Sequence, residues 1–251
     1  MPESVLLSVI IPAYNELENM RRGVLDQVVT YLKKQNYAWE VIISDDGSND
    51  GSEKLLDAFA GSNHNVTVLH NVHAGKAPTV TAGMLKATGK WRLFTDFDQS
   101  TPLSEIEKLL PYTKTHEVII GSREIEGALR DKEPFYRHLM GRGFNILVRM
   151  LAVRRIQDTQ CGFKLFSATA TERLFRSLYV YGGQRPRTDA FTGALDVELL
   201  FLARKFGFPT KEVPIFWQHY KSTRVSPVKD SLRMLYDILK IRAAYLFGKY
   251  R

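Results

Sequence analysis

The sequence predicts an α/β protein with a doubly wound, mostly parallel central sheet and helices on both faces. Strand and helix patterns alternate four times in the first hundred residues, and connections of this length join parallel strands. Residues 5–11 form a run of valine, leucine and isoleucine broken only by Ser8, which is typical of a strand buried on both faces. Charged side chains gather where the expected strands end. Ligands of open α/β sheets bind at that edge.

Composition limits the class of protein further. A chain of 251 residues has room for one or two domains and a sizeable core, and 44% hydrophobic with 25% charged residues is ordinary for a soluble globular protein. We see neither a signal peptide nor an apolar run of the ~20 residues that cross a bilayer. The single cysteine, Cys161, excludes an internal disulfide and fits a reducing compartment. We therefore expect a cytoplasmic protein.

The net charge of +8 and the pI near 9.5 favour an anionic partner. Nucleic acid, an anionic membrane and a phosphorylated substrate all meet that description. A platform for single-stranded nucleic acid would interleave aromatic and basic residues along a sheet face, and the sequence lacks this arrangement. Nucleic acid is therefore not expected as a partner.

The first hundred residues contain the clearest elements. We expect Pro12 to end the first strand, because proline cannot donate to a strand ladder. Apolar residues then keep helical spacing from Leu17 to Leu32. The remaining elements expected here are strands at 39–43, 66–69 and 91–95, a polar turn at 44–52, and a short helix through 80–84.

Six charged residues follow these strands and should lie along one rim of the sheet: Glu16, Asp45, Asp46, Lys76, Asp96 and Asp98. Each alone could be a turn residue, a helix cap or a solvated lysine. Side chains one residue apart on an extended chain point to opposite sides, so one of Asp96 and Asp98 would hold a metal and the other a sugar hydroxyl. Mg²⁺ or Mn²⁺ takes few protein carboxylates and completes its shell with phosphates and water. This pattern suggests a diphosphate substrate.

The second half begins with an expected helix at 103–110 and a strand at 118–120 that ends at Gly121-Ser122-Arg123. Residues 155–166 change from polar to aromatic and alternating, with Gly162 allowing close backbone approach. A helix led by Asp196-Val197-Glu198, a strand at 212–217 and a basic loop at 221–224 follow. No internal repeat or linker is visible.

Two segments, 135–151 and 231–251, are amphipathic with basic flanks. Such helices suit docking onto lipid headgroups. The alternative is a helix that packs on the core and exposes a solvated cationic face. The sequence leaves both open.

Several motifs resemble family-two glycosyltransferases of the GT-A fold: Val9-Ile10-Ile11-Pro12-Ala13-Tyr14-Asn15-Glu16, Ser44-Asp45-Asp46-Gly47-Ser48, Gly75-Lys76 and Asp96-Phe97-Asp98. The run Asp158-Thr159-Gln160-Cys161-Gly162-Phe163-Lys164-Leu165-Phe166 is similar to the polyprenyl-phosphate sugar transferases. Within that branch the chain most resembles the dolichyl-phosphate β-glucosyltransferases, with support from Asp196-Val197-Glu198-Leu199-Leu200. The resemblance spans nearly the whole length.

The resemblance implies a GT-A enzyme that moves a sugar, expected to be glucose, with inversion. The donor would be a nucleoside-diphosphate sugar such as UDP-glucose, and the acceptor a dolichyl or undecaprenyl phosphate. Residues 1–225 would form the catalytic domain, with 1–100 binding nucleotide and 101–225 binding acceptor, and 226–251 would contact the membrane. Eukaryotic relatives begin with a membrane helix that this sequence lacks. Attachment would then be peripheral, on the cytoplasmic face.

The resemblance also assigns roles. The nucleotide sugar would be bound by Pro12, Ala13, Tyr14, Asn15, Glu16, Asp45, Asp46, Gly75, Lys76 and Asp96. Asp96 and Asp98 would hold the Mg²⁺ or Mn²⁺, and Arg123, Arg137 and Arg224 would receive the acceptor phosphate. Asp98, Asp158 and Arg123 form the catalytic set, in which Asp158 would orient an arginine, take a proton or anchor its loop. Mannosyl relatives carry glutamine two residues after the second metal aspartate; here Ser100 stands there and Gln99 is one position early, which leaves metal ligation by either open.

Three rival functions remain. One is mannosyl transfer from GDP-mannose to the same lipid. Another keeps the fold but uses a soluble sugar or glycan acceptor, whose hydroxyl needs a general base such as Asp196 or Glu198. The third is a non-catalytic module that binds nucleotide or membrane.

Overall fold

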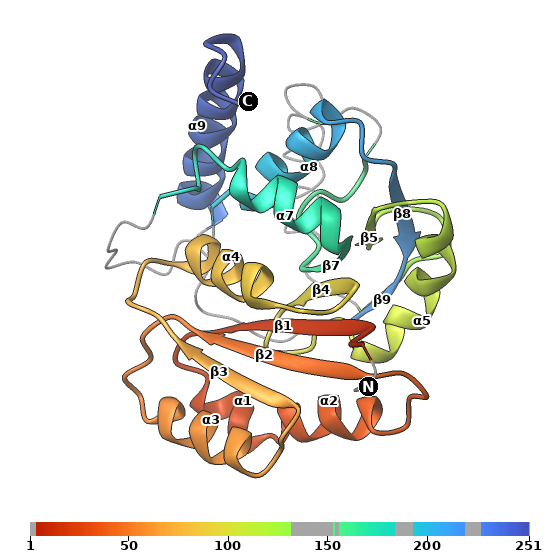
Figure 1. The fold of residues 1–251 in the computed structure, drawn as a ribbon. Coiled ribbons are helices and arrows are strands. Elements are labelled where there is room, and N and C mark those ends of the chain that lie inside the picture. The colour runs from red at the N-terminus through yellow and green to blue at the C-terminus, as the bar shows by residue number, and fades with distance from the viewer. Residues whose placement is uncertain (1–3, 132–152, 154–155, 184–192, 219–226, 251) are drawn as a thin grey trace.

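The computed structural model describes residues 4–131, 153, 156–183, 193–218 and 227–250. They form a seven-stranded sheet in the order β3-β2-β1-β4-β7-β5-β8 (Figure 1). Every neighbouring pair is parallel except the two pairs that β7 makes with β4 and β5. The strands are β1 Leu7–Ala13, β2 Trp39–Asp45, β3 Val66–His70, β4 Trp91–Thr95, β5 Val118–Ser122, β7 Phe163–Ser167 and β8 Thr210–Pro214, with β6 Leu129–Arg130 and β9 Phe216–Trp217 pairing separately.

Helices cover both faces of this sheet, as predicted. In Figure 1, α4, α7 and α8 lie on one face, and α1, α2 and α3 lie on the other. Their bounds are α1 Leu17–Arg21, α2 Val24–Leu32, α3 Ser52–Gly61, α4 Lys76–Lys86, α5 Ile106–Leu109, α7 Ala168–Arg176, α8 Leu195–Lys205 and α9 Pro227–Leu246, with 3₁₀ turns at Leu103–Glu105 and Leu110–Lys114. Each face has its own apolar core, because successive strand residues point to opposite sides. Ile10 belongs to the core under α4, whereas Val9 and Ile11 belong to the core over α2.

The prediction that Pro12 ends the first strand is wrong. β1 pairs with β2 through Ala13, which lies opposite Asp45. The Ala13 carbonyl accepts the Asp46 N–H at 2.8 Å, so the neighbouring Pro12 faces the β4 side, where pairing has already stopped at Ile10. The missing N–H of Pro12 therefore removes no bond from the ladder.

The single helix expected over residues 17–32 is also wrong. The segment forms α1 and α2, separated at Gly23, whose φ of 68° lies in the left-handed region. Glycine adopts this conformation without steric cost and commonly ends a helix. The change of direction lets α2 bury Val24, Leu25, Val28, Val29 and Leu32 against the sheet.

The acceptor half contains one further difference, and two of its predicted segments are not tested. The strand expected at 212–217 is divided between β8 in the main sheet and β9 in the small one. The amphipathic segment 135–151 and the basic loop 221–224, with Arg137 and Arg224, lie outside the described residues.

The C-terminal helix α9 has two apolar faces. Ile238, Ile241 and Ala244 are buried in the core that α8 shares. The opposite side exposes a stripe of large apolar residues, Leu232, Tyr236, Leu239 and Leu246, which Phe247 continues just after the helix. Because apolar residues occupy two sides of α9, the apolar pattern of the sequence is broader than one face of a helix. Within the described part of the chain, no helix combines the length and the hydropathy needed to cross a membrane.

Candidate active site

The loop after β1 is tied to the loop after β2. Asn15 has a left-handed backbone, with φ 54°. Its N–H donates to Ser48 Oγ at 2.8 Å, and its side-chain oxygen accepts the Asn49 N–H at 2.9 Å. Asparagine tolerates this conformation better than most residues. The motif Pro12 to Glu16 is thereby held at the carboxyl edge of the sheet, where the sequence placed it.

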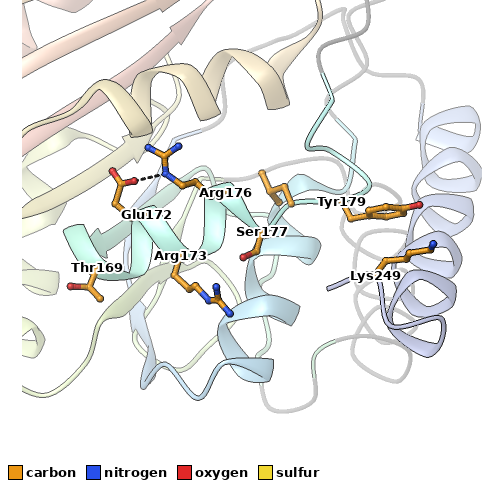
Figure 2. Close-up of a pocket in the computed structure, with 8 residues that line it drawn as sticks. Thr169, Glu172, Arg173, Arg176, Ser177, Tyr179 and Lys249 are labelled. Carbon is orange, nitrogen blue, oxygen red and sulfur yellow. Dashed lines mark hydrogen bonds and ion pairs between the residues drawn. The ribbon is translucent and has the colours of Figure 1, made fainter. Parts of the chain in front are cut away.

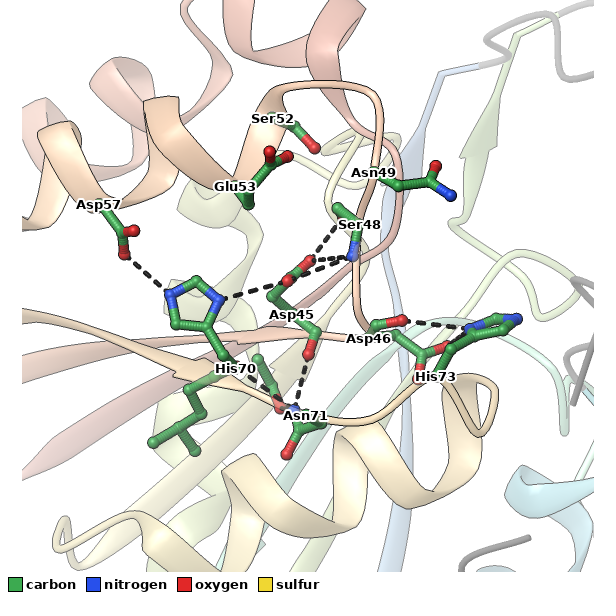
Figure 3. A network of polar contacts seen from close by, with 12 residues as sticks. Asp45, Asp46, Ser48, Asn49, Ser52, Glu53, Asp57, His70, Asn71 and His73 are labelled. Carbon is green, nitrogen blue, oxygen red and sulfur yellow. Dashed lines mark hydrogen bonds and ion pairs between the residues drawn. The ribbon is translucent and has the colours of Figure 1, made fainter. Parts of the chain in front are cut away.

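Asp45 ends β2 and organises the turn that follows (Figure 3). Its carboxylate is almost fully buried and accepts from Ser48 Oγ at 2.5 Å and from the Ser48 N–H at 3.3 Å. His70, at the end of β3, lies 3.4 Å from Asp45 and 2.9 Å from Asp57. Hydrogen bonds to Asp57 and then to Asp45 raise the pKa of His70. Asp45 therefore connects β2 and β3; direct nucleotide contact by its carboxylate stays a prediction.

Asp46 has a similar bracing role toward the start of α4. Its carboxylate accepts the Ala74 and Gly75 N–H groups at 2.9 and 3.0 Å. His73 Nδ1 lies 2.9 Å from the same carboxylate (Figure 3), and the His73 ring stacks on Tyr14 with centroids 4.3 Å apart. The sequence pattern does not mark His73 as a site residue. The feature that could indicate a role for His73 is its position between the end of a strand and Gly75-Lys76.

Lys76 and Asp96 form the centre of the rim. Lys76 is the first residue of α4, and its Nζ lies 2.5 Å from Asp96 Oδ1. Burial lowers the pKa of Lys76, but the charge of Asp96 and its neighbours outweighs burial and gives a net rise. The Asp96 side chain is 40% exposed, so it can still meet a ligand. The pair places one positive charge and one carboxylate where the sequence predicted a diphosphate.

Gly162, the residue before β7, packs directly against the Asp96 side chain. A Cβ atom on Gly162 would overlap the Asp96 carboxylate. β7 begins at Phe163 opposite Thr95, because it runs antiparallel to β4. The close backbone approach expected at Gly162 is confirmed, and its partner is the candidate metal ligand.

The residues after Asp96 fit a hard divalent cation. Burial, and then the charge of Asp96, raise the pKa of the Asp98 carboxyl, so a cation would relieve a real repulsion. The Gln99 amide donates to the Asp96 carbonyl at 2.8 Å, which leaves its buried Oε1 without a partner, and its backbone is left-handed at φ 51°. Ser100 donates its N–H to Asp98 at 2.9 Å.

Among the described residues, no group of three or more His, Cys, Asp or Glu side chains is arranged to hold a metal ion. An ion here would take Asp96 and Asp98 and fill its remaining positions with substrate and water oxygens. Mg²⁺ and Mn²⁺ accept such a shell. The donor set therefore fits the predicted cofactor.

Arg123 and Asp158 form a forked ion pair. Arg123 Nε and Nη2 lie 2.7 and 2.9 Å from the two Asp158 oxygens, and the Arg123 N–H also donates to Asp158 at 3.0 Å. Burial alone would raise the pKa of Asp158, but Arg123 outweighs it and holds the pKa at about 2. The Asp158 side chain is 0% exposed. These contacts support two of the roles expected for Asp158, orienting an arginine and anchoring its loop, and the lowered pKa disfavours the third, that of a proton acceptor.

Asp196 and Glu198 begin α8 but face different surroundings. Asp196 Oδ1 lies 2.5 Å from Nζ of the fully buried Lys164 in β7, and the charge of Asp196 also acts on Lys76. Glu198 is buried and accepts the N–H groups of Tyr179, Val180 and Tyr181 together with the Tyr250 hydroxyl. These contacts disfavour Glu198 as the general base of the hydroxyl-acceptor alternative, because its oxygens already accept from structural donors.

The chain matches the family model "Glycosyl transferase family 2" over residues 8–175. A dolichyl-phosphate β-glucosyltransferase of Drosophila melanogaster is 35% identical, over 99% of this chain and 78% of the relative. One of Dictyostelium discoideum is 32% identical, over 99% and 77%. In structure, a glucosyl-3-phosphoglycerate synthase from Mycobacterium tuberculosis, solved with Mn²⁺, uridine diphosphate and glucosyl-3-phosphoglycerate, has a TM-score of 0.63 at 17% identity, over 94% of this chain and 80% of that one.

The family match covers more than half of the chain, and the relatives cover nearly all of it. The structural likeness confirms the GT-A fold that the motifs implied. The chain therefore belongs to glycosyl transferase family 2 and is a glycosyltransferase related over nearly its whole length to the dolichyl-phosphate β-glucosyltransferases.

Proposed function

We propose that the enzyme transfers a glucosyl unit from UDP-glucose to a polyprenyl phosphate, with inversion at the anomeric carbon. The observation that carries the proposal is the segment 158–162. At one end Asp158 holds the Arg123 fork, and at the other Gly162 seats the Asp96 carboxylate. One short segment thus joins an arginine suited to an acceptor phosphate to an acid that would hold the metal ion of the donor diphosphate. The names of the relatives support the glucosyl unit and the dolichyl-phosphate acceptor.

The donor would lie along the rim formed by β1, β2 and β4. Pro12 to Glu16, Gly75 and the Asp45–Asp46 turn would surround the nucleoside, and Lys76 would neutralise phosphate oxygens. Asp96 and Asp98 would hold a Mg²⁺ or Mn²⁺ ion. When bound, such an ion supplies Lewis-acid stabilisation of the departing diphosphate.

The acceptor phosphate would approach Arg123. The second pKa of this phosphate is about 6, so the attacking oxygen is already largely ionised at neutral pH. Bringing that charge toward the donor diphosphate costs about 4 kcal/mol per unit charge pair at ~4 Å and an effective dielectric of ~20. The part of the Arg123 guanidinium that does not bind Asp158 would meet the phosphate and reduce this repulsion, because a guanidinium stays ionised. Asp158 fixes the fork's orientation and moves no proton.

This chemistry explains why the site can work without a general base. A soluble hydroxyl acceptor would need one, but Glu198 is occupied by structural donors and Asp196 is paired with Lys164. These contacts favour the lipid phosphate over a soluble glycan.

We further propose that the enzyme is peripheral on the cytoplasmic face of a membrane. The exposed stripe of α9, Leu232, Tyr236, Leu239, Leu246 and Phe247, would enter the headgroup region. Exposed Lys240 and Arg242 flank it and would meet anionic lipid. The single buried Cys161 is consistent with a reducing compartment.

A donor and acceptor panel tests the proposal. UDP-glucose and GDP-mannose would each be offered with dolichyl phosphate, undecaprenyl phosphate or free sugars, with and without EDTA. We expect EDTA-sensitive glucosyl transfer to a polyprenyl phosphate. Transfer to free sugars alone would overturn the acceptor assignment, turnover only with GDP-mannose would overturn the donor, and undiminished turnover in EDTA would overturn the metal.

A further inference from the structure

A buried ion pair between β7 and α8 stands apart from the residues assigned to the proposed reaction. Lys164 lies in β7 with 0% of its side chain exposed, and its Nζ donates to Asp196 Oδ1 at 2.5 Å and to the Cys161 carbonyl. Its partners on the two neighbouring strands are Phe94 and Ile120, which are both buried. A lysine is almost never fully buried at such an apolar position unless its charge is paired. The ion pair therefore needs an explanation.

This ion pair lies beside the pair formed by Lys76 and Asp96. Lys164 and Phe94 are direct cross-strand partners, so their side chains leave the sheet on the same face. Lys76 Nζ lies 5.2 Å from the centre of the Phe94 ring. Burial lowers the pKa of Lys76, and the charges of Asp96 and then Asp196 raise it. The two ion pairs are therefore close together, where α4 and α8 begin.

The charged residues around the cavity beside α7 do not converge in this way. That cavity, of about 590 Å³, is lined by Arg173, Arg176 and Lys249 among others. The charged ends of these three side chains point to different sides, and Arg176 is paired with Glu172 at 2.7 Å (Figure 2). These cations therefore form no common site for one ligand.

Lys164 ties Asp196 to the segment that joins the proposed acceptor and donor ends. The carbonyl that accepts from Lys164 belongs to Cys161, which lies between Asp158 and Gly162 in the sequence. The proposed acceptor phosphate lies at the Asp158 end of this segment, and the proposed donor diphosphate lies at the Gly162 end. In a transfer reaction the sugar lies between these two groups. The Asp196 carboxylate is thus expected beside the sugar.

Asp196 has an oxygen available for a ligand. Its side chain is 20% exposed, and Oδ2 receives no hydrogen bond from the residues that the structure describes. A carboxylate here would repel either phosphate, but it can accept hydrogen bonds from the hydroxyl groups of an uncharged sugar. Such bonds are stronger than those between neutral groups because the acceptor is charged. Asp196 therefore suits the sugar and not the phosphates.

We propose that Asp196 binds a hydroxyl group of the transferred sugar and that Lys164 is the positioning residue that directs the Asp196 carboxylate toward it. The inference rests on the proposed transfer from a nucleotide sugar and adds a residue that distinguishes one sugar from another. Lys164 itself is enclosed by protein and does not reach the substrate.

Calorimetric titration of the full chain with UDP-glucose and with UDP, both with Mn²⁺, tests the role of Asp196. The ratio of the two affinities isolates the sugar, because removing a negative charge near Lys76 changes both diphosphate affinities alike. In Asp196→Asn we expect the affinity for UDP-glucose relative to UDP to fall about tenfold, since the hydrogen bond from the sugar loses its charged acceptor. An unchanged ratio would overturn the proposal.

Two further variants separate this effect from a loss of stability. Asp196→Asn alone leaves Lys164 buried without its ion-pair partner, whereas Asp196→Asn with Lys164→Gln leaves neither charge buried. The affinity ratio should fall by the same factor in both. The matched control is Asp26→Asn, an exposed first-turn acid of α2 on the opposite face of the sheet (Figure 1). Thermal melting shows which variants are folded, and an equal fall in the control would overturn the proposal.

Lys164→Gln tests the positioning role, because it retains the Asp196 carboxylate but removes the group that directs it. Its affinity ratio should lie between those of the wild type and Asp196→Asn. A wild-type ratio in the folded variant would overturn the positioning role.

Monodeoxy analogues of UDP-glucose identify the hydroxyl group. One analogue should bind the wild type about tenfold more weakly than UDP-glucose does, and Asp196→Asn should bind the two with nearly equal affinity. If every analogue lost the same factor in both proteins, the proposal would be overturned.

Transfer assays separate this inference from the proposed function. The binding ratio needs no acceptor, so absence of transfer to polyprenyl phosphate would count against the proposed function alone. If the wild type used only GDP-mannose, the proposed donor would be wrong, and the ratio measured with GDP-mannose and GDP would decide the role of Asp196. A lower kcat in Asp196→Asn with an unchanged affinity ratio would make Asp196 a general base and overturn the inference.

Discussion

Gly162 lies directly against the Asp96 carboxylate, so closely that a single methyl group would occupy the space of its oxygens. The contact joins the first residue before β7 to the first residue after β4. It follows from the antiparallel pairing of these strands, in which Thr95 faces Phe163.

Gly162→Ala should therefore displace Asp96 and reduce kcat by at least about 100-fold, since misplacing a catalytic group by ~1 Å has this effect. The measurement is steady-state transfer with saturating substrates. The control is Gly61→Ala, because a Cβ there meets nothing within 4 Å. Unchanged kcat in Gly162→Ala, with the melting temperature preserved, would contradict the proposed role of Asp96.

Arg123→Lys should raise KM for polyprenyl phosphate roughly tenfold and leave KM for the nucleotide sugar unchanged, because an ammonium cannot make the forked pair with Asp158 and also keep further N–H groups for the acceptor. Lysine is a better substitution than alanine for this test. Arg123→Ala would leave Asp158 as an unpaired buried charge and cost about 3–5 kcal/mol of folding free energy. If only the KM for the nucleotide sugar changed, Arg123 would be assigned to the nucleotide-sugar site and not to the acceptor site.

Asp98→Asn should abolish transfer yet raise the melting temperature by about 1–2 °C. Burial and Asp96 raise the pKa of Asp98 above that of an unfolded aspartate, so the folded state binds the proton more tightly. The ionised carboxylate therefore destabilises the fold at neutral pH, and this cost disappears as pH falls through the raised pKa. Calorimetry at neutral pH measures the melting temperature, and a transfer assay at the same pH measures the activity.

The metal gives an internal control on that assignment. If Asp98 holds the ion, proton and metal compete for one carboxylate, and raising the Mn²⁺ concentration should move the acidic limb of the pH–rate profile to lower pH. If the acidic limb of the pH–rate profile does not move at any metal concentration, Asp98 is not a ligand of the metal.

Glu198→Gln should lower the melting temperature by about 5–10 °C, since an amide has only one oxygen to replace the two that accept from Tyr179, Val180, Tyr181 and Tyr250. The kcat of the folded fraction should be unchanged. Loss of transfer without loss of stability would instead restore Glu198 as a general base and favour a hydroxyl acceptor.

Phe247→Ser should weaken binding to phosphatidylcholine vesicles without changing the melting temperature, because the side chain is 77% exposed at the end of the α9 stripe. Val72→Ser is the matched control, at the same 77% exposure on the loop after β3. Equal vesicle binding by wild type and Phe247→Ser would assign the stripe to another partner.

Local patterns were enough to predict much of the first hundred residues. The buried run of β1, the alternation with helices and the acids at the strand ends all follow from hydrophobic period and turn chemistry, which act over a few residues. The structure accordingly places Asp45, Lys76 and Asp96 at the expected edge of the sheet. The family assignment came from the same stretches.

The sequence by itself thus determined the fold class, the family and the rim of charged residues. Tertiary structure alone decided that Gly162 seats Asp96, that His73 stacks on Tyr14, and that Asp196 faces Lys164 while Glu198 is enclosed by backbone donors. It also decided that α9 has one face in the core and one outside. The physical reason is that each of these relationships joins segments distant in sequence, and no local period or propensity encodes which distant segment a side chain will meet.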